Sequence, residues 1–239
     1  MDRIGLAIAA LGVAAATLTA CSGDDGGDDF AKSPAEDIVA AAKSDMGDLK
    51  AVKVSGTVNN DGQEISIDIQ SSSDGDCTGS IGVDEGTAEL LGVGGDTWMR
   101  PDEAFWRSFA GENAEQVLTL VGDKWVVIPA EDDSFNQFCD VDALLDQLLK
   151  EDDEEDESTY SVTGTEELDG DEVVLVDNED PEDGTSTGYV LVDDPHYLVK
   201  IEKTDGEDTG TVTFSEFDEE FDVEAPAEDD VVDLGSLGS

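Results

Sequence analysis

The chain has 239 residues, 38% of them hydrophobic, which suits one domain of moderate size. It carries 62 acidic and 11 basic residues, so its formal net charge is −51. This excess argues against a nucleic-acid partner, because nucleic-acid binding needs lysine and arginine to neutralise phosphates, and against electrostatic attachment to anionic lipid.

An apolar run, 4–18, follows Arg3 and ends at Leu18-Thr19-Ala20-Cys21. A positive start, an apolar centre and small residues before a cleavage point are typical of a secretory signal peptide. The cysteine directly after Leu-Thr-Ala resembles the lipobox of bacterial lipoproteins, in which that cysteine receives a diacylglyceryl group and becomes the first residue of the mature chain. The resemblance implies a signal peptide over 1–20, lipidation of Cys21 and a lipid-anchored protein on the extracytoplasmic face of the cell membrane.

The next residues, 21–33, are rich in glycine and aspartate and predict a flexible acidic tether. A single domain is expected over 34–235. Its first element is a helix of about 15 residues, with Ser33 as N-cap and Glu36 completing a capping box. The apolar residues that follow at helical spacing predict one buried face: Ile38, Ala42, Met46 and Leu49.

From Ala51 onward, apolar residues recur at every second position, which is typical of half-buried strands. A hairpin is expected with its turn at 59–62. Further strands are expected at 77–83, 87–93, 96–100, 124–129, 159–168, 172–177, 188–192, 197–204 and 211–217. Short helices are expected from 101 through 106, over 112–121 and over 141–149, and a solvated loop is expected at the seven consecutive acids 151–157. The pattern predicts an α+β fold with a long, curved antiparallel sheet.

The three cysteines become an even set once Cys21 is assigned to lipid. Cys77 and Cys139 then predict a disulfide in an oxidising compartment. A reactive cysteine is the less favoured alternative, because no basic residue lies near either one in the sequence to lower a thiol pKa.

Candidate catalytic and metal sites are few. The run Asp74-Gly75-Asp76-Cys77-Thr78-Gly79, with Glu85 at its twelfth position, approaches a calcium-binding EF-hand loop but is flanked by predicted strands, so a turn is favoured. His196 is the one histidine, in a proline-containing turn. No nucleophile elbow, phosphate loop or cysteine–histidine set occurs, so the chain is expected to be no enzyme and to hold no cofactor.

Aromatic and aliphatic side chains concentrate where helices interrupt the strands. They pack in a filled core or line an apolar pocket between helices and sheet, and the sequence leaves both alternatives open. The candidate lining residues are Trp98, Phe105, Trp106, Leu118, Trp125 and Leu144.

Several segments together resemble the actinobacterial lipoproteins of the LolA/LppX/LprG group. They are the lipobox at 18–21, PAEDIVAAA at 34–42, VKVSG at 52–56, WMRPDEAFW at 98–106, YLVKIE at 197–202 and the closing segment 225–233. The resemblance implies an incomplete barrel, that is, a strongly bent antiparallel sheet with short helices covering its concave face and an apolar cavity for lipids or lipid-linked molecules. Two features depart from the group: the extreme acidity and the cysteine pair.

Two functions follow as expectations. The first is a membrane-anchored, non-enzymatic carrier or binding protein for an apolar or lipidic ligand, with the membrane as partner through its diacylglyceryl cysteine. The second is a surface sensor or scaffold with a filled core that acts through a protein partner of the cell envelope.

Overall fold

The computed structural model describes residues 29–60, 62–149, 159–181, 184–206 and 208–235. The predicted signal peptide, the lipidation site Cys21, most of the tether and the predicted acidic loop at 151–157 lie outside the described residues.

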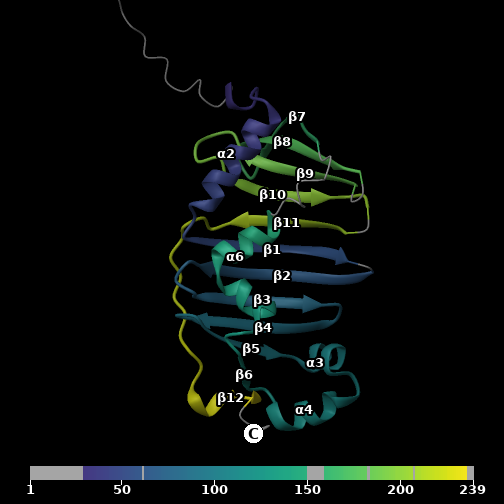
Figure 1. Ribbon diagram of the computed structural model, residues 1–239, viewed down its shortest axis with the longest axis vertical. Helices are drawn as coiled ribbons and strands as arrows, with labels where there is room; N and C mark the ends of the chain where they lie inside the picture. Colours follow the sequence, from purple (N-terminus) through teal and green to yellow (C-terminus); the bar gives the residue numbers. More distant parts are fainter. Residues whose placement is uncertain (1–28, 61, 150–158, 182–183, 207, 236–239) are drawn as a thin grey trace, which may run out of the picture.

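Twelve strands form one sheet (Figure 1), in the spatial order β12-β6-β5-β4-β3-β2-β1-β11-β10-β9-β8-β7. Neighbours pair antiparallel, apart from β12, which runs parallel to β6. The strands are β1 Ala51–Asn60, β2 Gln63–Ser72, β3 Cys77–Val83, β4 Gly86–Val93, β5 Asp96–Pro101, β6 Trp125–Ile128, β7 Thr159–Leu168, β8 Asp171–Asp180, β9 Gly184–Leu191, β10 Leu198–Lys203, β11 Thr209–Ser215 and β12 Val231–Val232. The order begins at β12 and ends at β7, so the described strands form an open sheet and no closed barrel.

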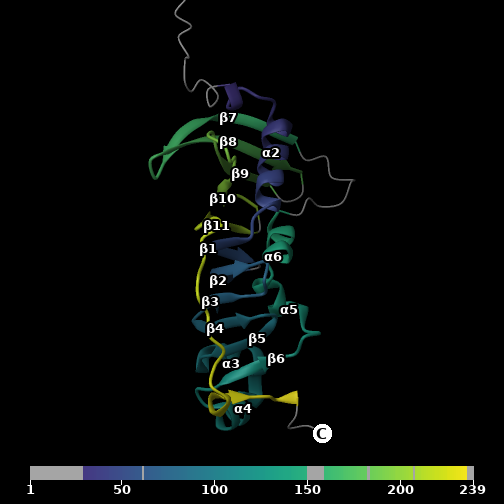
Figure 2. The same ribbon diagram turned by 90° about the vertical axis from the view of Figure 1, so that its left-hand side faces the viewer.

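Helices α2, α5 and α6 lie on one side of this sheet, which we call the inner face (Figure 2). Side chains of α3 and α4 are buried with residues of the same face at the lower end of the sheet. In Figures 1 and 2, α2 lies beside the upper strands, α6 beside the middle strands, and α3 and α4 at the lower end. The helices are α2 Ala35–Gly47, α3 Glu103–Ala110, α4 Ala114–Val121, α5 Asp133–Asn136 and α6 Val141–Leu148, with 3-10 turns η1 Gly111–Asn113, η2 Gln137–Cys139 and η3 Glu228–Asp230. The predicted α+β fold, a bent antiparallel sheet with short helices on one face, is confirmed.

The structure adds elements that the sequence pattern did not predict, namely α5, η2, η3 and β12. The predicted capping of the first helix is wrong. Pro34 occupies the N-cap and makes no side-chain cap, while the Ser33 hydroxyl donates to the carbonyl of Asp29 at 3.5 Å. The predicted apolar face of this helix is confirmed, because Ile38, Ala42 and Met46 are buried.

A C-terminal segment, 216–230, joins the middle of the sheet to one of its ends. It leaves β11, follows the strand ends on the side away from α2 and α6, and reaches β12 (Figure 2). Asp218 fixes its start, because its Oδ1 accepts from the backbone nitrogens of Lys50 at 2.6 Å and Ala51 at 3.3 Å. β12 then pairs with β6, so the segment links the central and terminal strands.

Among the strand glycines, Gly56 and Gly79 mark points where neighbouring strands approach too closely for a side chain on the inner face. A Cβ atom at Gly56 would lie 2.2 Å from the carbonyl oxygen of Thr211, and one at Gly79 would lie 2.0 Å from that of Asp68. Both contacts are with backbone, which cannot rotate away. Glycine in a strand interior is typical of such tight bends, so these two positions allow the sheet to curve toward its helices.

We expect Gly56→Ala to lower the free energy of unfolding by about 2 kcal/mol or more, because the added methyl group overpacks against backbone. Gly47→Ala is the matched control, since a Cβ there has nothing within 4 Å and should change stability by less than about 1 kcal/mol. Urea unfolding followed by circular dichroism measures both. Equal stabilities for the two variants would contradict the requirement for glycine at the bend.

Candidate functional site

The inner face holds two clusters of buried side chains. The first lies under α2 and α6, with Met46 and Leu144 packed over residues of β1 and β8–β11. The second lies under α3 and α4, with Phe105 and Val121 packed over residues of β2–β6. Both clusters pack on the same sheet, but each is covered by a different pair of helices.

The boundary between the clusters is the candidate ligand site. Ile67 of β2 and Phe138 of η2 are the partly buried residues that pack against both clusters. The inner-face row through Ile67 continues across the sheet as Ile81, Gly56, Val212, Ile201 and Gly188. Two of these positions have no side chain, and Ile67 and Ile201 are half-buried. The middle of the inner face is therefore apolar and only partly covered.

Two of the predicted lining residues lie inside the molecule. Phe105 and Leu144 are each 1% exposed, but Phe105 belongs to the second cluster and Leu144 to the first. Trp106 packs against the second cluster, and its Nε1 is buried with no hydrogen-bond partner among the described residues. Leu118 of α4 is half-buried. These residues flank the boundary from different sides.

Trp98 and Trp125 lie on the outer face. Their sequence neighbours Met99 and Val126 pair with each other and are buried in the second cluster, so the adjacent tryptophans point to the opposite side of the sheet. The guanidinium of Arg100 lies 4.6 Å from the ring centroid of Trp125. The structure thus does not bring the six predicted lining residues together.

Ile67, Phe138 and Ile201 were not among the predicted site residues. The alternation of Ile65, Ile67 and Ile69 with polar residues does place Ile67 on a buried strand face. Phe138 belongs to a stretch that the sequence pattern left unassigned. Only the pairing of distant strands shows that Ile67 and Ile201 share one row.

A disulfide holds the helical layer to the sheet. It joins Cys77, at the start of β3, to Cys139, at the end of η2 and directly before α6, with the Cα atoms 4.9 Å apart. A Cβ on Gly92 of β4 would lie 2.9 Å from both sulfurs, so this glycine makes room for the bond. The predicted pair of cysteines is the one that the structure joins.

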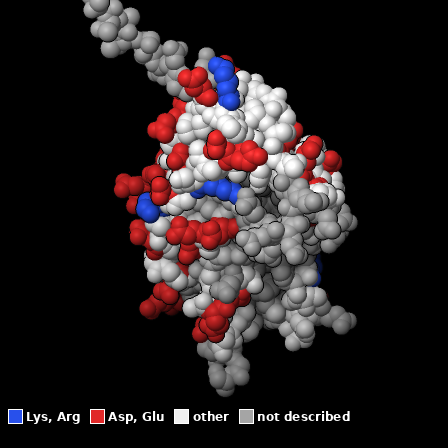
Figure 3. All heavy atoms as spheres, turned by 45° about the horizontal axis from the view of Figure 1, so that its top comes forward, with Lys and Arg blue, Asp and Glu red and all other residues white. Residues whose placement is uncertain are grey.

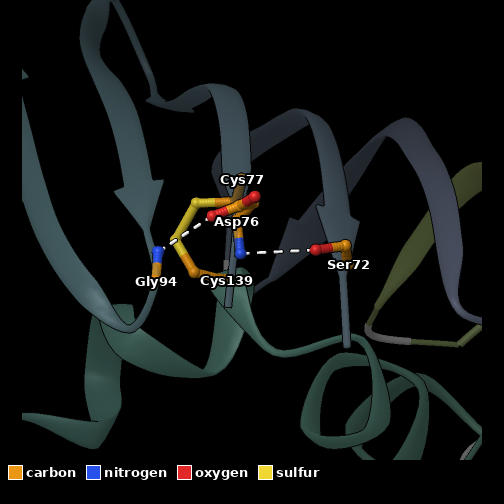
Figure 4. Close-up of a disulfide and its surroundings, with 5 residues drawn as sticks. All are labelled: Ser72, Asp76, Cys77, Gly94 and Cys139. Atoms are coloured by element: carbon orange, nitrogen blue, oxygen red, sulfur yellow. Dashed lines mark hydrogen bonds between the residues drawn. A yellow bond between two sulfur atoms is a disulfide. The ribbon is translucent and has the colours of Figure 1, made fainter. Parts of the chain in front are cut away.

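The residues before Cys77 form a turn and not an EF-hand calcium loop. Asp76 accepts a hydrogen bond from the backbone nitrogen of Gly94 at 2.8 Å, and its own nitrogen donates to the Ser72 hydroxyl at 3.3 Å (Figure 4). Thr78 and Ile81 lie in the extended strand β3 instead of a loop. The turn is confirmed, and within the described residues no three histidine, cysteine or acidic side chains are grouped to hold a metal ion.

His196 connects the start of the described chain to the sheet. Its backbone nitrogen donates to Asp45 of α2 at 2.7 Å, and its ring stacks on Phe30 with centroids 3.5 Å apart. It lies in the turn between β9 and β10, as expected. These contacts give it a structural role in fixing the residues that precede α2.

A polar network occupies the outer face of β9 and β10. Tyr189 donates to Glu202 at 3.1 Å, Lys200 donates to the same carboxylate at 2.6 Å, and the Lys200 ammonium lies 4.3 Å from the Tyr189 ring. Burial, followed by the hydrogen bond to Glu202, raises the pKa of Tyr189. The hydrogen bond from Lys200 lowers the pKa of Glu202, and the same bond raises the pKa of Lys200. The three side chains satisfy one another's hydrogen-bonding groups, so we assign this network a structural role.

Helices α3 and α4 expose apolar side chains. Phe109 and Leu120 are 58% and 54% exposed, and together with Val162 of β7 they are the large hydrophobic residues that stand out as exposed in the described chain. Glycines in the left-handed region, Gly111 at φ 53° and Gly122 at φ 58°, follow these two helices. This helix pair is the apolar part of the surface beside the second cluster. Among the described residues, no helix is long and apolar enough to span a membrane.

Reduction of the disulfide should lower the free energy of unfolding by about 4 kcal/mol, because the cysteines are 62 residues apart and the bond restricts a large loop in the unfolded chain. Urea unfolding with and without reductant measures the difference. The control is the double variant Cys77→Ser/Cys139→Ser, on which the reductant should have no effect. An unchanged midpoint for the reduced parent chain would contradict the assigned role of the bond.

The sequence and the structure were compared with those of known proteins. No family model matches the sequence, and no curated protein is similar to it. The structure is similar to that of LprF from Mycobacterium bovis, with a TM-score of 0.56 and 17% sequence identity over 81% of this chain and 97% of that one. It is also similar to the lipoprotein LppX of Mycobacterium tuberculosis, with a TM-score of 0.51 and 15% identity over 80% of this chain and all of that one. The resemblance seen in the sequence is thus confirmed at the level of the fold: the chain has the fold of LprF and of the lipoprotein LppX.

Proposed function

We propose that this protein is a membrane-anchored extracytoplasmic lipoprotein that binds or carries an apolar, lipidic ligand between its bent sheet and its helices. The observation that carries the proposal is the partly covered apolar row on the inner face, at the boundary between the two buried clusters. The likeness in fold to the lipoprotein LppX supports the same class of protein.

The ligand site we propose centres on Ile67, Phe138 and Ile201. Phe105 and Trp106 lie on one side of it and Leu144 on the other. A hydrocarbon chain placed there gains about 0.8 kcal/mol per buried methylene, so selectivity comes from apolar contact and needs few polar groups. Trp98 and Trp125, on the outer face, are not part of this site.

The proposed anchor is the diacylglyceryl group on Cys21. Phe30, which stacks on His196, fixes where the chain joins the folded domain. The nine peptide steps from Cys21 to Phe30 span at most about 30 Å, so the anchor keeps the β9–β10 end of the domain within that distance of the bilayer. Two acyl chains suffice for stable attachment without help from the acidic surface.

Ligand binding is tested with a fluorescent fatty acid and the full chain. The parent should bind with a saturable increase in fluorescence, and Ile67→Trp should weaken binding at least about tenfold, because the larger ring fills the boundary between the clusters. Ser80→Trp is the matched control, since Ser80 pairs with Asp68 and Glu89 on the outer face and should leave binding unchanged. Binding unaffected by Ile67→Trp, or no binding by the parent, would contradict the proposed site.

Anchoring is tested by fractionation and intact mass. The parent chain, expressed in a bacterium that processes lipoproteins, should be recovered with membranes and should carry the mass of a lipidated chain that begins at Cys21. Cys21→Ser should abolish the acyl mass, because the diacylglyceryl group is attached through the cysteine sulfur and serine has none. A parent chain without added acyl mass would contradict the proposed membrane location.

A filled-core scaffold is the second candidate, and a specific observation favours it: both clusters contain side chains with almost no exposure, among them Phe105 and Leu144. Chemical cross-linking on intact cells distinguishes the two. Recovery of one stoichiometric envelope protein with no extractable lipid supports the scaffold, and lipid released from the purified chain supports the carrier.

A further inference from the structure

Strand β7 forms one end of the sheet, and in the described chain it pairs on one side only, with β8. Ten residues long, it is exposed at all positions apart from Tyr160 and Leu168. In an antiparallel edge strand, alternate residues direct their N–H and C=O groups away from the neighbouring strand. The stretch from Ser161 to Leu168 therefore presents a backbone ladder that another strand can pair with.

The composition of β7 differs from that of a protected edge. Natural sheets shield an edge with charged residues, above all lysine, with proline, with a bulge or with a covering helix. From Ser161 to Thr165 this strand has no charged residue, and its acids, Glu166 and Glu167, come only at its end. A bulge at the register shift between Val162 and Gly164 twists the strand but leaves both halves paired with β8. The edge is thus suited to strand addition, and only its charge restricts the partner.

The charge around β7 indicates which kind of strand can pair with its edge. No lysine or arginine occurs between Lys150 and Lys200, a span that contains β7, β8 and β9. Figure 3, in which the β7 end of the molecule is turned forward, shows uncharged surface bordered by many acidic and a few basic side chains. A second copy of a chain with a net charge of −51 is repelled from this end, whereas a basic strand is attracted.

We propose that the free edge of β7 binds an extended, basic peptide segment of a partner protein by strand addition. The partner's backbone pairs with the residues from Val162 to Leu168. Glu166 and Glu167 point to opposite faces of the strand, so alternate lysine or arginine side chains of the partner, which share one face, meet whichever of the two glutamates lies on that face. The exposed side chain of Val162 supplies an apolar contact at the other end. This surface is separate from the proposed lipid site and does not depend on it.

The test uses the full chain and an acetylated eight-residue peptide of alternating lysine and valine. Amide hydrogen exchange should slow in β7 when the peptide is added and stay unchanged in β3, which is paired on both sides. The matched control is the same peptide methylated on alternate backbone nitrogens, which keeps every charge but removes edge-directed donors. It should bind at least about tenfold more weakly, since strand addition depends on main-chain hydrogen bonds.

A charge variant completes the test. Glu166→Gln/Glu167→Gln should weaken peptide binding and flatten its dependence on salt, whereas Glu219→Gln/Glu220→Gln, which removes two exposed acids from the C-terminal segment, should not. Equal binding of the methylated peptide would overturn the proposal in favour of adsorption on the acidic surface. Protection of β7 through self-association in 1 M salt, detected by sedimentation, would assign the edge to a second copy and overturn the basic partner.

Discussion

The close approach of backbone to backbone at Gly56 and Gly79 is the constraint on which the architecture depends. At both positions a neighbouring carbonyl oxygen occupies the space of a Cβ atom on the inner face. A sheet of twelve strands that lacked such points would stay too flat to wrap its helices. The bend creates two different faces, one that buries apolar clusters under helices and one that carries polar and aromatic side chains toward solvent.

Much of this arrangement follows from patterns that are local in the sequence. Strand β3 has the bounds that the alternation of its residues predicted, and Cys77 and Cys139 are paired as the cysteine count required. Short elements escaped prediction because two or four residues are too few to establish a period, as in β12 and α5. The missing N-terminal cap has a physical cause: Pro34 has no side-chain acceptor, and the Ser33 hydroxyl is engaged behind the helix.

The candidate site was harder to predict because it depends on which side of a strand faces the helices. Trp98 and Met99 are neighbours in sequence, and both suit a buried position, but only Met99 points to the inner face. Composition alone therefore predicts Trp98 and Trp125 to line the same pocket as Phe105, although they lie on the other face. Ile67 and Ile201 come to share one row of the inner face only through β1 and β11, a pairing between segments far apart in the chain. No periodicity within either segment contains that information.

The seam between β1 and β11 has a consequence for how the chain is made. Ser55 and Thr213, hydrogen-bonded across it, are 158 residues apart in the sequence. The two halves of the sheet cannot join until most of the polypeptide has left the ribosome, and β6 gains its last neighbour only when residue 232 follows. Contacts of such long range form slowly. A nascent chain of this topology therefore stays incompletely folded while it lengthens.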